Sequence, residues 1–470
     1  MLPLVVLFSL GCGDSRKAQD ARIILTADIR GRLVPCGCFT GQLGGMTRLY
    51  TVLERPFGAP ELRVDAGDAL RGPQDFEIME YLKILEAFEA MHFHALNLGA
   101  RESQLSANTL RRLQADTGAP MVSANLVDVA TGQPVVQPYI ETRLGSRRII
   151  VTGILDLASA AKVKQGEGLI VADPDLVLRE LLPVLRQKCD VLVVLAFANE
   201  NRLRGLAERF FEADFILGGD VSQPSGNTRA INQSHVFYVA NESRTIGLID
   251  FVIAPKGKQS RPEIAVHNAT PLLLFDNIPE ASEIVKMAIA YREAVRVATL
   301  DIDDPEKLAS DQIPGVLSAA HYVGSGACIS CHQAEHEIWE ATAHAHAWAT
   351  LEQHKADADP NCIGCHSVGF GTPSGYRREF KHEKLVNVGC ESCHGPGSRH
   401  VEERSAGGPI TFKFRPLAEG DCRSCHYGEF SRPFDWDQFW PAIAHGQNPR
   451  QLASPLTSPP SPSPMPSPYE

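Results

Sequence analysis

The sequence predicts a layered α/β sandwich followed by a mainly α region in which strand patterns are rare. Up to about residue 300, short apolar runs that end in Asp or Gly-Gly alternate with amphipathic helical patterns, as is typical of layered α/β domains. Beyond that point the cysteines cluster, because eight of the twelve lie between Cys328 and Cys425. Such clustering indicates ligation or covalent attachment and not a general disulfide framework.

The first region contains seven runs that predict strands and three segments that predict helices. The strand runs are apolar and short, and functional loops are expected where they end. The expected strands are 22–28, 61–68, 148–155, 190–197, 213–220, 236–241 and 248–253, and the expected helices are 107–114, 174–187 and 281–300.

Composition divides the chain further. Residues 21–300 form the α/β domain, the acidic segment 301–320 is a linker, and 321–446 form the second domain. The Pro- and Ser-rich stretch 447–470 cannot bury a core and is expected to be a disordered tail. Residues 1–20 include an apolar run that ends in Gly11-Cys12, which looks like a lipoprotein signal with Cys12 as the lipidated residue. A buried N-terminal strand is the alternative.

The net charge of -11 argues against nucleic acid as a partner. Because 44% of the residues are hydrophobic and 21% are charged, the chain can build ordinary folded domains. Outside the N-terminal run, no stretch approaches the roughly 18 apolar residues of a membrane span. The mature protein is therefore expected to be soluble or tethered to the membrane by a lipid.

Four pentapeptides of the pattern Cys-x-x-Cys-His lie in the second domain: C-I-S-C-H, C-I-G-C-H, C-E-S-C-H and C-R-S-C-H. Two thiols three positions apart reach the two vinyl groups of one haem as thioethers, and the adjacent His lies under the iron. Zinc sites are the alternative, but zinc does not require a His after every second Cys. The sequence therefore predicts four covalently bound c-type haems. Their attachment residues are Cys328, Cys331, Cys362, Cys365, Cys390, Cys393, Cys422 and Cys425, and their proximal ligands are His332, His366, His394 and His426.

Further motifs extend around these pentapeptides: Y-V-G-S-G-A-C-I-S-C-H, W-E-A-T-A-H-A-H-A, V-G-C-E-S-C-H-G-P-G-S-R-H and D-W-D-Q-F-W-P-A-I-A-H-G. From about Tyr322 to Gly446 the chain resembles the cytochrome c-554 family of tetrahaem electron carriers. The resemblance implies that three histidines bind haem iron on the distal side. They are His344, His400 and His445, with His336, His346 and His321 as rivals.

One haem of that family lacks a distal His, and the resemblance implies the same here. Packed haems exchange electrons quickly, so the second domain is expected to conduct electrons between redox protein partners. An open iron would also admit a small ligand such as nitric oxide or hydroxylamine.

The first domain carries T-A-D-I-R-G-R-L, V-D-A-G-D, N-L-G-A-R-E, V-S-A-N-L and I-L-G-G-D-V-S in that order. From about Arg22 to Pro255 it resembles the metallophosphoesterase domain of periplasmic 5'-nucleotidases. That family holds two metal ions with Asp, His and Asn side chains, and the metals activate a water and polarise a phosphoryl group. The resemblance makes Asp28 and Asp68 vestigial metal ligands.

Most of the other expected ligands are replaced. The His expected two residues after Asp28 is Arg30, and the Asn-His pair expected before Glu102 is Ala100-Arg101. The His expected near Phe197 is missing, and the Gly-His-x-His ending reads G-D-V-S from Gly219. Guanidinium groups repel a dication, so we expect two-metal hydrolysis to be lost.

Two features of this domain suggest a different use. Arg30 and Arg101 would bind a small oxyanion if they face the former phosphate site, or they pair with Asp28 and Asp68. Cys36 and Cys38 form a C-G-C pair in a Gly-rich loop after the first strand. Two thiols so close can form a strained, reducible disulfide and would act as a redox pair. In the alternative, Cys189 is the structural partner of one of them. The loop also resembles that of a group of phosphoesterase-like proteins, some with selenocysteine at this place.

These observations support three functions. The first is a periplasmic electron-transfer protein, because haem is attached covalently outside the cytoplasm. The second is a redox enzyme that acts on a small nitrogen, sulfur or selenium compound at an open haem or at Cys36 and Cys38. The third is a 5'-nucleotidase-type phosphoesterase fused to a cytochrome.

Overall fold

The computed structural model describes most of the chain as two compact units. The first unit comprises residues 1–307 with 358–360, and the second comprises 308–357 and 361–470. The structure describes residues 17–35, 42–55, 58–240, 243–255, 261–304, 320–379, 383–426 and 434–445. The predicted lipidation site Cys12, the pair Cys36 and Cys38, and the predicted tail 447–470 lie outside these ranges.

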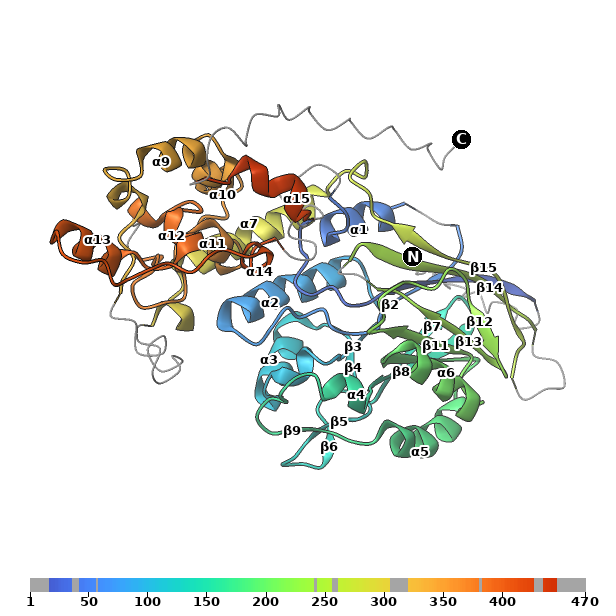
Figure 1. Cartoon of the computed structure of the whole chain (residues 1–470). Helices are drawn as coiled ribbons and strands as arrows, with labels where there is room; N and C mark the ends of the chain where they lie inside the picture. Colours follow the sequence, from blue (N-terminus) through green and yellow to red (C-terminus); the bar gives the residue numbers. More distant parts are fainter. Residues whose placement is uncertain are drawn as a thin grey trace, which may run out of the picture. The chain divides into compact units, whose positions relative to one another are not determined.

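Two six-stranded sheets form the centre of the first unit (Figure 1). One has the strand order β15-β14-β1-β2-β3-β4, and the other has the order β12-β13-β11-β10-β8-β7. Their strands are β1 (Gln19–Thr26), β2 (Glu61–Asp65), β3 (Ala95–Asn97), β4 (Met121–Val122), β7 (Tyr139–Leu144), β8 (Arg147–Leu155), β10 (Val191–Phe197), β11 (Phe215–Gly219), β12 (Arg229–Ile231), β13 (Ser234–Tyr238), β14 (Thr245–Ile253) and β15 (Ile264–Leu273). A small third sheet contains β5 (Leu126–Asp128), β6 (Gln133–Pro134) and β9 (Leu169–Val171).

Apolar side chains on both faces of the strands explain why each sheet is covered on both sides. In β1, Ile23 and Leu25 join a core between the two sheets, whereas Ile24 joins a second core on the opposite face of its sheet. Successive strand residues point to opposite faces, so a strand that is apolar on both faces must be covered twice. The first unit is therefore a four-layer α/β sandwich.

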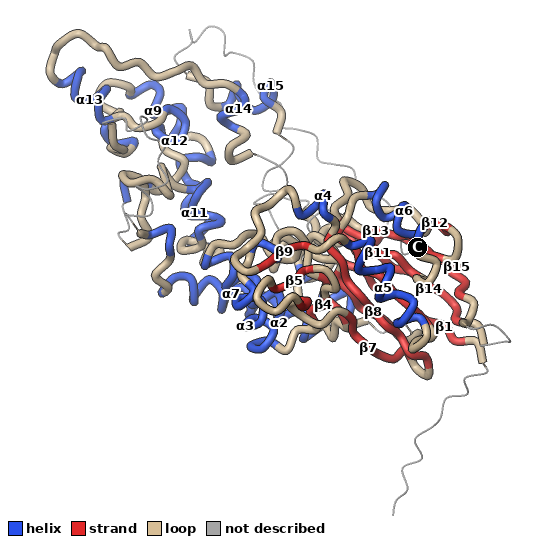
Figure 2. Tube along the Cα trace, turned by 90° about the horizontal axis from the view of Figure 1, so that it is seen from below, coloured by secondary structure: helices blue, strands red, loops and turns tan. Residues whose placement is uncertain are grey.

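Helices cover both outer faces of the sandwich. The second core packs the first sheet against α1 (Met46–Leu53), α2 (Asp75–Ala90), α3 (Ala107–Thr117) and α7 (Ser282–Val297). A third core packs the other sheet against α5 (Pro174–Arg186) and α6 (Glu200–Arg209), which Figure 2 shows lying over its strands. The remaining helix of this unit, α4 (Leu157–Ala160), follows β8. The seven expected strands and three expected helices each overlap an observed element, so these predictions are confirmed.

The second unit is built from short helices. They are α9 (Gln333–Glu340), α10 (Ala347–Gln353), α11 (Pro360–His366), α12 (Cys390–His394), α13 (Ser398–Ser405), α14 (Glu419–Cys422) and α15 (Trp436–Phe439). Its apolar core is small and centres on Trp348, Leu351, Ile363 and Tyr376. The mainly α architecture predicted for this region is confirmed. Among the described helices, none is both long and apolar enough to cross a bilayer.

Glu102 holds together the strand-end loops of the first unit. Its side chain is fully buried, and its carboxylate accepts hydrogen bonds from the backbone N–H groups of Asp68 (3.0 Å), Leu70 (2.7 Å) and Gly99 (2.8 Å). These donors follow β2 and β3, so one side chain satisfies two neighbouring loops. Removing it would leave three buried N–H groups without their acceptor.

We expect Glu102→Ala to lower the free energy of unfolding of the first unit by at least about 3 kcal/mol, since each unsatisfied buried donor costs about 1–3 kcal/mol. Hydrogen exchange of the full chain in increasing urea, read on peptides from β1 to β3, measures this loss. Glu180→Ala, which removes an exposed carboxylate on α5, is the control and should change the value by less than about 0.5 kcal/mol. Equal exchange in both variants would contradict the assigned role.

Candidate functional sites

Acidic side chains gather where the central strands of the first unit end. Asp28 follows β1, Asp68 follows β2, and Asp220 follows β11. The strands β1, β2 and β3 run parallel, so their carboxyl ends meet at one edge of the sheet. All three aspartates have left-handed backbone, with φ of 58°, 63° and 60°. Non-glycine residues rarely adopt this conformation, and it concentrates at functional sites.

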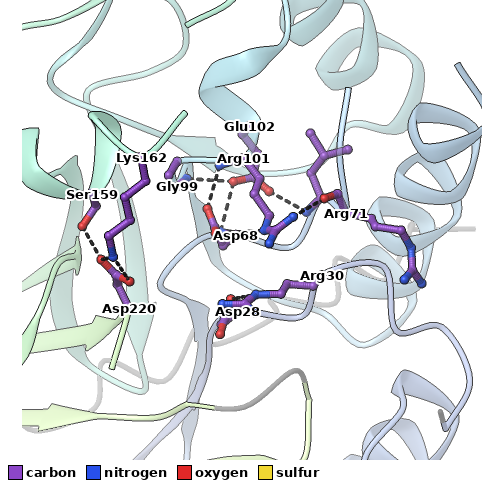
Figure 3. A network of polar contacts seen from close by, with 12 residues as sticks. Asp28, Arg30, Asp68, Arg71, Gly99, Arg101, Glu102, Ser159, Lys162 and Asp220 are labelled. Carbon is purple, nitrogen blue, oxygen red and sulfur yellow. Dashed lines mark hydrogen bonds and ion pairs between the residues drawn. The ribbon is translucent and has the colours of Figure 1, made fainter. Parts of the chain in front are cut away.

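Each of these aspartates is paired with a cation of the chain, as Figure 3 shows. Arg30 Nε lies 2.5 Å from Asp28 Oδ1, and Arg101 Nε lies 3.4 Å from Asp68 Oδ2. These two ion pairs correspond to the alternative given by the sequence, in which Arg30 and Arg101 pair with Asp28 and Asp68.

The third pair involves a residue that sequence reasoning missed. Lys162 Nζ lies 2.6 Å from Asp220 Oδ1, and Ser159 Oγ donates to Asp220 Oδ2 at 2.5 Å. Lys162 lies just after α4 and far from Asp220 in the sequence, and no local motif marks it. Only the fold brings the two side chains together.

The electrostatics of this edge follow from burial. Removal from water raises the pKa of Asp68 well above its ordinary value, and the neighbouring carboxylates Glu102 and Asp28 raise it further. The backbone N–H of Arg101, which donates to Asp68 Oδ1 at 2.8 Å, and its guanidinium act in the opposite direction. Within the part of the chain that the structure describes, no group of three or more His, Cys, Asp or Glu side chains is arranged to hold a metal ion.

Cys189 is buried in the first unit, and its thiol is free. The thiol contacts the Leu185 carbonyl oxygen at 3.4 Å, and burial raises its pKa to about 11. The alternative in which Cys189 pairs with Cys36 or Cys38 is therefore wrong. Such a thiol is inert and serves as a small apolar core residue.

In the second unit the Cys-x-x-Cys-His motifs adopt helical turns. The second and third motifs lie within α11 and α12. In the first and fourth motifs the backbone N–H of the His donates to the carbonyl of the first Cys, at 2.9 Å for His332 and 2.8 Å for His426. Residues three and four apart lie on one face of such a turn. Each motif can therefore present two thiols and one imidazole on the same side, as a covalently attached haem requires.

Three of the motif histidines face a second imidazole from a distant segment. The ring centres lie 6.2 Å apart for His332 and His400, 5.9 Å for His426 and His344, and 5.8 Å for His394 and His445. Two imidazoles that bind one metal ion at about 2 Å on opposite sides would hold their ring centres roughly 6 Å apart. The side chains therefore fit a hexacoordinate haem iron at three motifs.

Burial favours the neutral form of several of these rings. It lowers the pKa of His344, His394 and His426 below the ordinary histidine value, and neighbouring histidines lower the first two further. Neutral imidazole is the form that binds metal.

The fourth motif histidine, His366, differs from the others. Its Nδ1 lies 2.7 Å from the carbonyl oxygen of Ala347, which leaves Nε2 as the nitrogen available for iron. Among the described residues, no imidazole faces its ring in the way seen in the three pairs; His382 lies outside them.

Two of the three rival histidines contact Glu340, and the third is exposed. His346 Nε2 lies 3.1 Å from the Glu340 carbonyl oxygen, and His336 Nδ1 lies 3.7 Å from a carboxylate oxygen of Glu340. His321 is exposed, and its backbone N–H donates to Ser398 Oγ at 2.8 Å.

The motifs also approach one another. The backbone N–H of Cys390 donates to Ser325 Oγ at 3.1 Å, and the backbone N–H of Cys328 donates to the carbonyl oxygen of Ser325 at 3.0 Å. The first motif therefore lies beside the third. Sequence reasoning did not find these neighbours, because no local pattern encodes them.

Both parts of the chain are similar to known proteins. Residues 327–395 match the family model described as cytochrome c554 and c-prime. Cytochrome c-554 of Nitrosomonas europaea is 37% identical over 118 residues, which cover 22% of this chain and 47% of that protein. The chain thus spans about half the length of this relative.

The first unit matches phosphoesterases. A 5'-nucleotidase of Diplobatis ommata is 25% identical over 233 residues, which cover 47% of this chain and 40% of that protein. A solved 5'-nucleotidase precursor structure from Thermus thermophilus superposes with a TM-score of 0.51 at 19% identity, over 59% of each chain. At this identity the structural match shows the fold alone. The chain thus combines a cytochrome c554 family domain in its C-terminal part with a 5'-nucleotidase-like metallophosphoesterase fold in its N-terminal part.

Proposed function

We propose that the protein is a periplasmic c-type cytochrome that transfers electrons through four covalently bound haems, and that its first unit is a scaffold without two-metal hydrolysis. The observation that carries the proposal is the set of facing imidazole pairs at three of the four Cys-x-x-Cys-His motifs. The match to the cytochrome c554 family supports the same function.

In this proposal each motif supplies two attachment thiols and a proximal imidazole. The second imidazole that would hold each iron is His400 for the motif of His332, His344 for the motif of His426, and His445 for the motif of His394. When bound, the haems supply reversible one-electron chemistry at iron. The protein holds the imidazoles of each pair about 6 Å apart and places the first motif beside the third, so that bound haems could exchange electrons.

The partners would be other redox proteins of the periplasm, because covalent haem attachment takes place outside the cytoplasm. A lipid anchor at Cys12 would keep the protein at the membrane surface. A small oxyanion near Arg30 and Arg101 is disfavoured, since both guanidinium groups already bind carboxylates of the chain.

A second candidate function is a redox enzyme that acts on a small nitrogen, sulfur or selenium compound. His366 favours it, because no described imidazole faces its ring and the iron above it would remain open to a ligand. The third candidate, a working 5'-nucleotidase, rests on sequence similarity of 25% identity and on the fold, with no observation at the site that favours it.

We expect the oxidised holoprotein to show three low-spin bis-imidazole irons and one high-spin iron in electron paramagnetic resonance. His400→Ala should convert one low-spin signal to a high-spin signal, because it removes the imidazole opposite His332. His346→Ala is the matched control and should leave the spectrum unchanged, since its ring faces the Glu340 carbonyl group. Four low-spin signals in the native protein would contradict the assignment of an open iron, and they would also contradict the candidate function as a redox enzyme at that iron.

We also expect no hydrolysis of bis-p-nitrophenyl phosphate or of a nucleotide when manganese is added. A dication would have to displace Arg30 from Asp28 and Arg101 from Asp68 before it could bind. Rates are compared between the native protein and Asp28→Ala. Turnover by the native protein that is lost in Asp28→Ala would overturn the scaffold assignment and favour the phosphoesterase.

A further inference from the structure

Glu391 is a buried acidic residue inside the third haem motif, C-E-S-C-H. Its exposed fraction is 4%, whereas the residue at the same motif position is exposed at Ile329 and Arg423 and is a buried apolar residue at Ile363. A carboxylate is rarely buried unless specific contacts stabilise it. The third motif therefore has a feature that haem attachment alone does not require.

Backbone N–H groups satisfy both oxygens of Glu391. Oε2 accepts from Val323 (3.0 Å) and Gly324 (2.7 Å), and Oε1 accepts from Gly397 (2.7 Å). Among the described residues, no Arg or Lys side chain forms an ion pair with this carboxylate. Several N–H donors stabilise the ionised carboxylate, so a negative charge is held here without a neutralising cation.

The three donors belong to segments that build two haem sites. Val323 and Gly324 precede the first motif, and Gly397 immediately precedes α13, which carries His400. The ring of His400 faces His332 of the first motif. Glu391, which lies in the third motif, thus connects that motif both to the first motif and to α13.

A second contact reinforces this junction. The backbone N–H of Cys390 donates to Ser325 Oγ at 3.1 Å, and the backbone N–H of Cys328 donates to the carbonyl oxygen of Ser325 at 3.0 Å. Glu391 directly follows Cys390 and accepts a hydrogen bond from Gly324, which precedes Ser325. One carboxylate therefore lies close to the attachment residues of both motifs.

We propose that Glu391 is a positioning residue that fixes the first and third motifs against each other and lowers the reduction potentials of the haems they hold. This inference rests on the proposed function. A buried negative charge stabilises ferric over ferrous iron, and the low dielectric of the interior strengthens the effect. The other two haems lie at motifs that this carboxylate does not connect, so their potentials should change less.

The test is a spectroelectrochemical titration of full-length holoprotein carrying Glu391→Gln, which keeps the shape of the side chain and removes its charge. We expect a positive shift of two of the four reduction potentials, with unchanged low-spin signals and haem content. Glu402→Gln removes the same charge from an exposed position on α13 and should leave the potentials unchanged within error. Equal potentials in the two variants would overturn the electrostatic role.

Glu391→Asp covers the case in which Glu391→Gln does not assemble. It retains the charge with a shorter reach, so its potentials should stay closer to the native values than to those of any charge-free variant that assembles. A shift in Glu391→Asp as large as that in Glu391→Ala would contradict the proposal. The haem content of the purified protein distinguishes failure of the proposed function from failure of this inference. A native protein without c-type haem refutes the proposed function, whereas four haems with unmoved potentials refute this inference alone.

Discussion

In the second unit, three motif histidines each lie close to 6 Å from a second imidazole ring, and the proposed haem sites depend on these separations. The three pairs join segments that are far apart in the sequence, as when the ring of His344 faces His426. The helices that carry the motifs are too short to be stable alone, since α12 has five residues and α14 has four. Their geometry must come from tertiary contacts, of which the buried carboxylate of Glu391 is the clearest.

The first unit shows a different constraint, in which buried carboxylates at the strand ends find their partners within the chain. Asp28, Asp68 and Asp220 have left-handed φ values, and Glu102 accepts hydrogen bonds from the loops that position Asp68. Arg30, Arg101 and Lys162 pair with these three carboxylates. The pairs stabilise the fold, because an unpaired carboxylate at this buried edge would be costly.

Most features that the sequence predicts correctly are encoded in short local patterns. The alternating strands are readable because burial on both faces leaves an apolar run, and each Cys-x-x-Cys-His motif is contained in five residues. The helix α2 was missed because it buries Phe76, Tyr81 and Phe88 on several sides, so its sequence lacks a clear polar face. The resemblance to the cytochrome c-554 family supplied the three distal histidines. The fold was needed to show which of them faces which motif.

Lys162 and Glu391 were missed because each acts through partners that are distant in the sequence. The partners of Glu391 are backbone N–H groups, which leave no trace in residue identity.

Buried negative charge is stabilised in two ways along the chain. At the strand ends of the first unit, Asp28, Asp68 and Asp220 each lie within 3.4 Å of a guanidinium or ammonium group, whereas the neighbouring Glu102 accepts hydrogen bonds from three backbone N–H groups. In the second unit, Glu391 is stabilised by neutral N–H donors, which solvate the charge without cancelling it. A field that survives burial can act on nearby iron, whereas a cancelled one cannot. Because Glu391 binds the segments before the first motif and before α13, its field would act on the haems proposed at the first and third motifs.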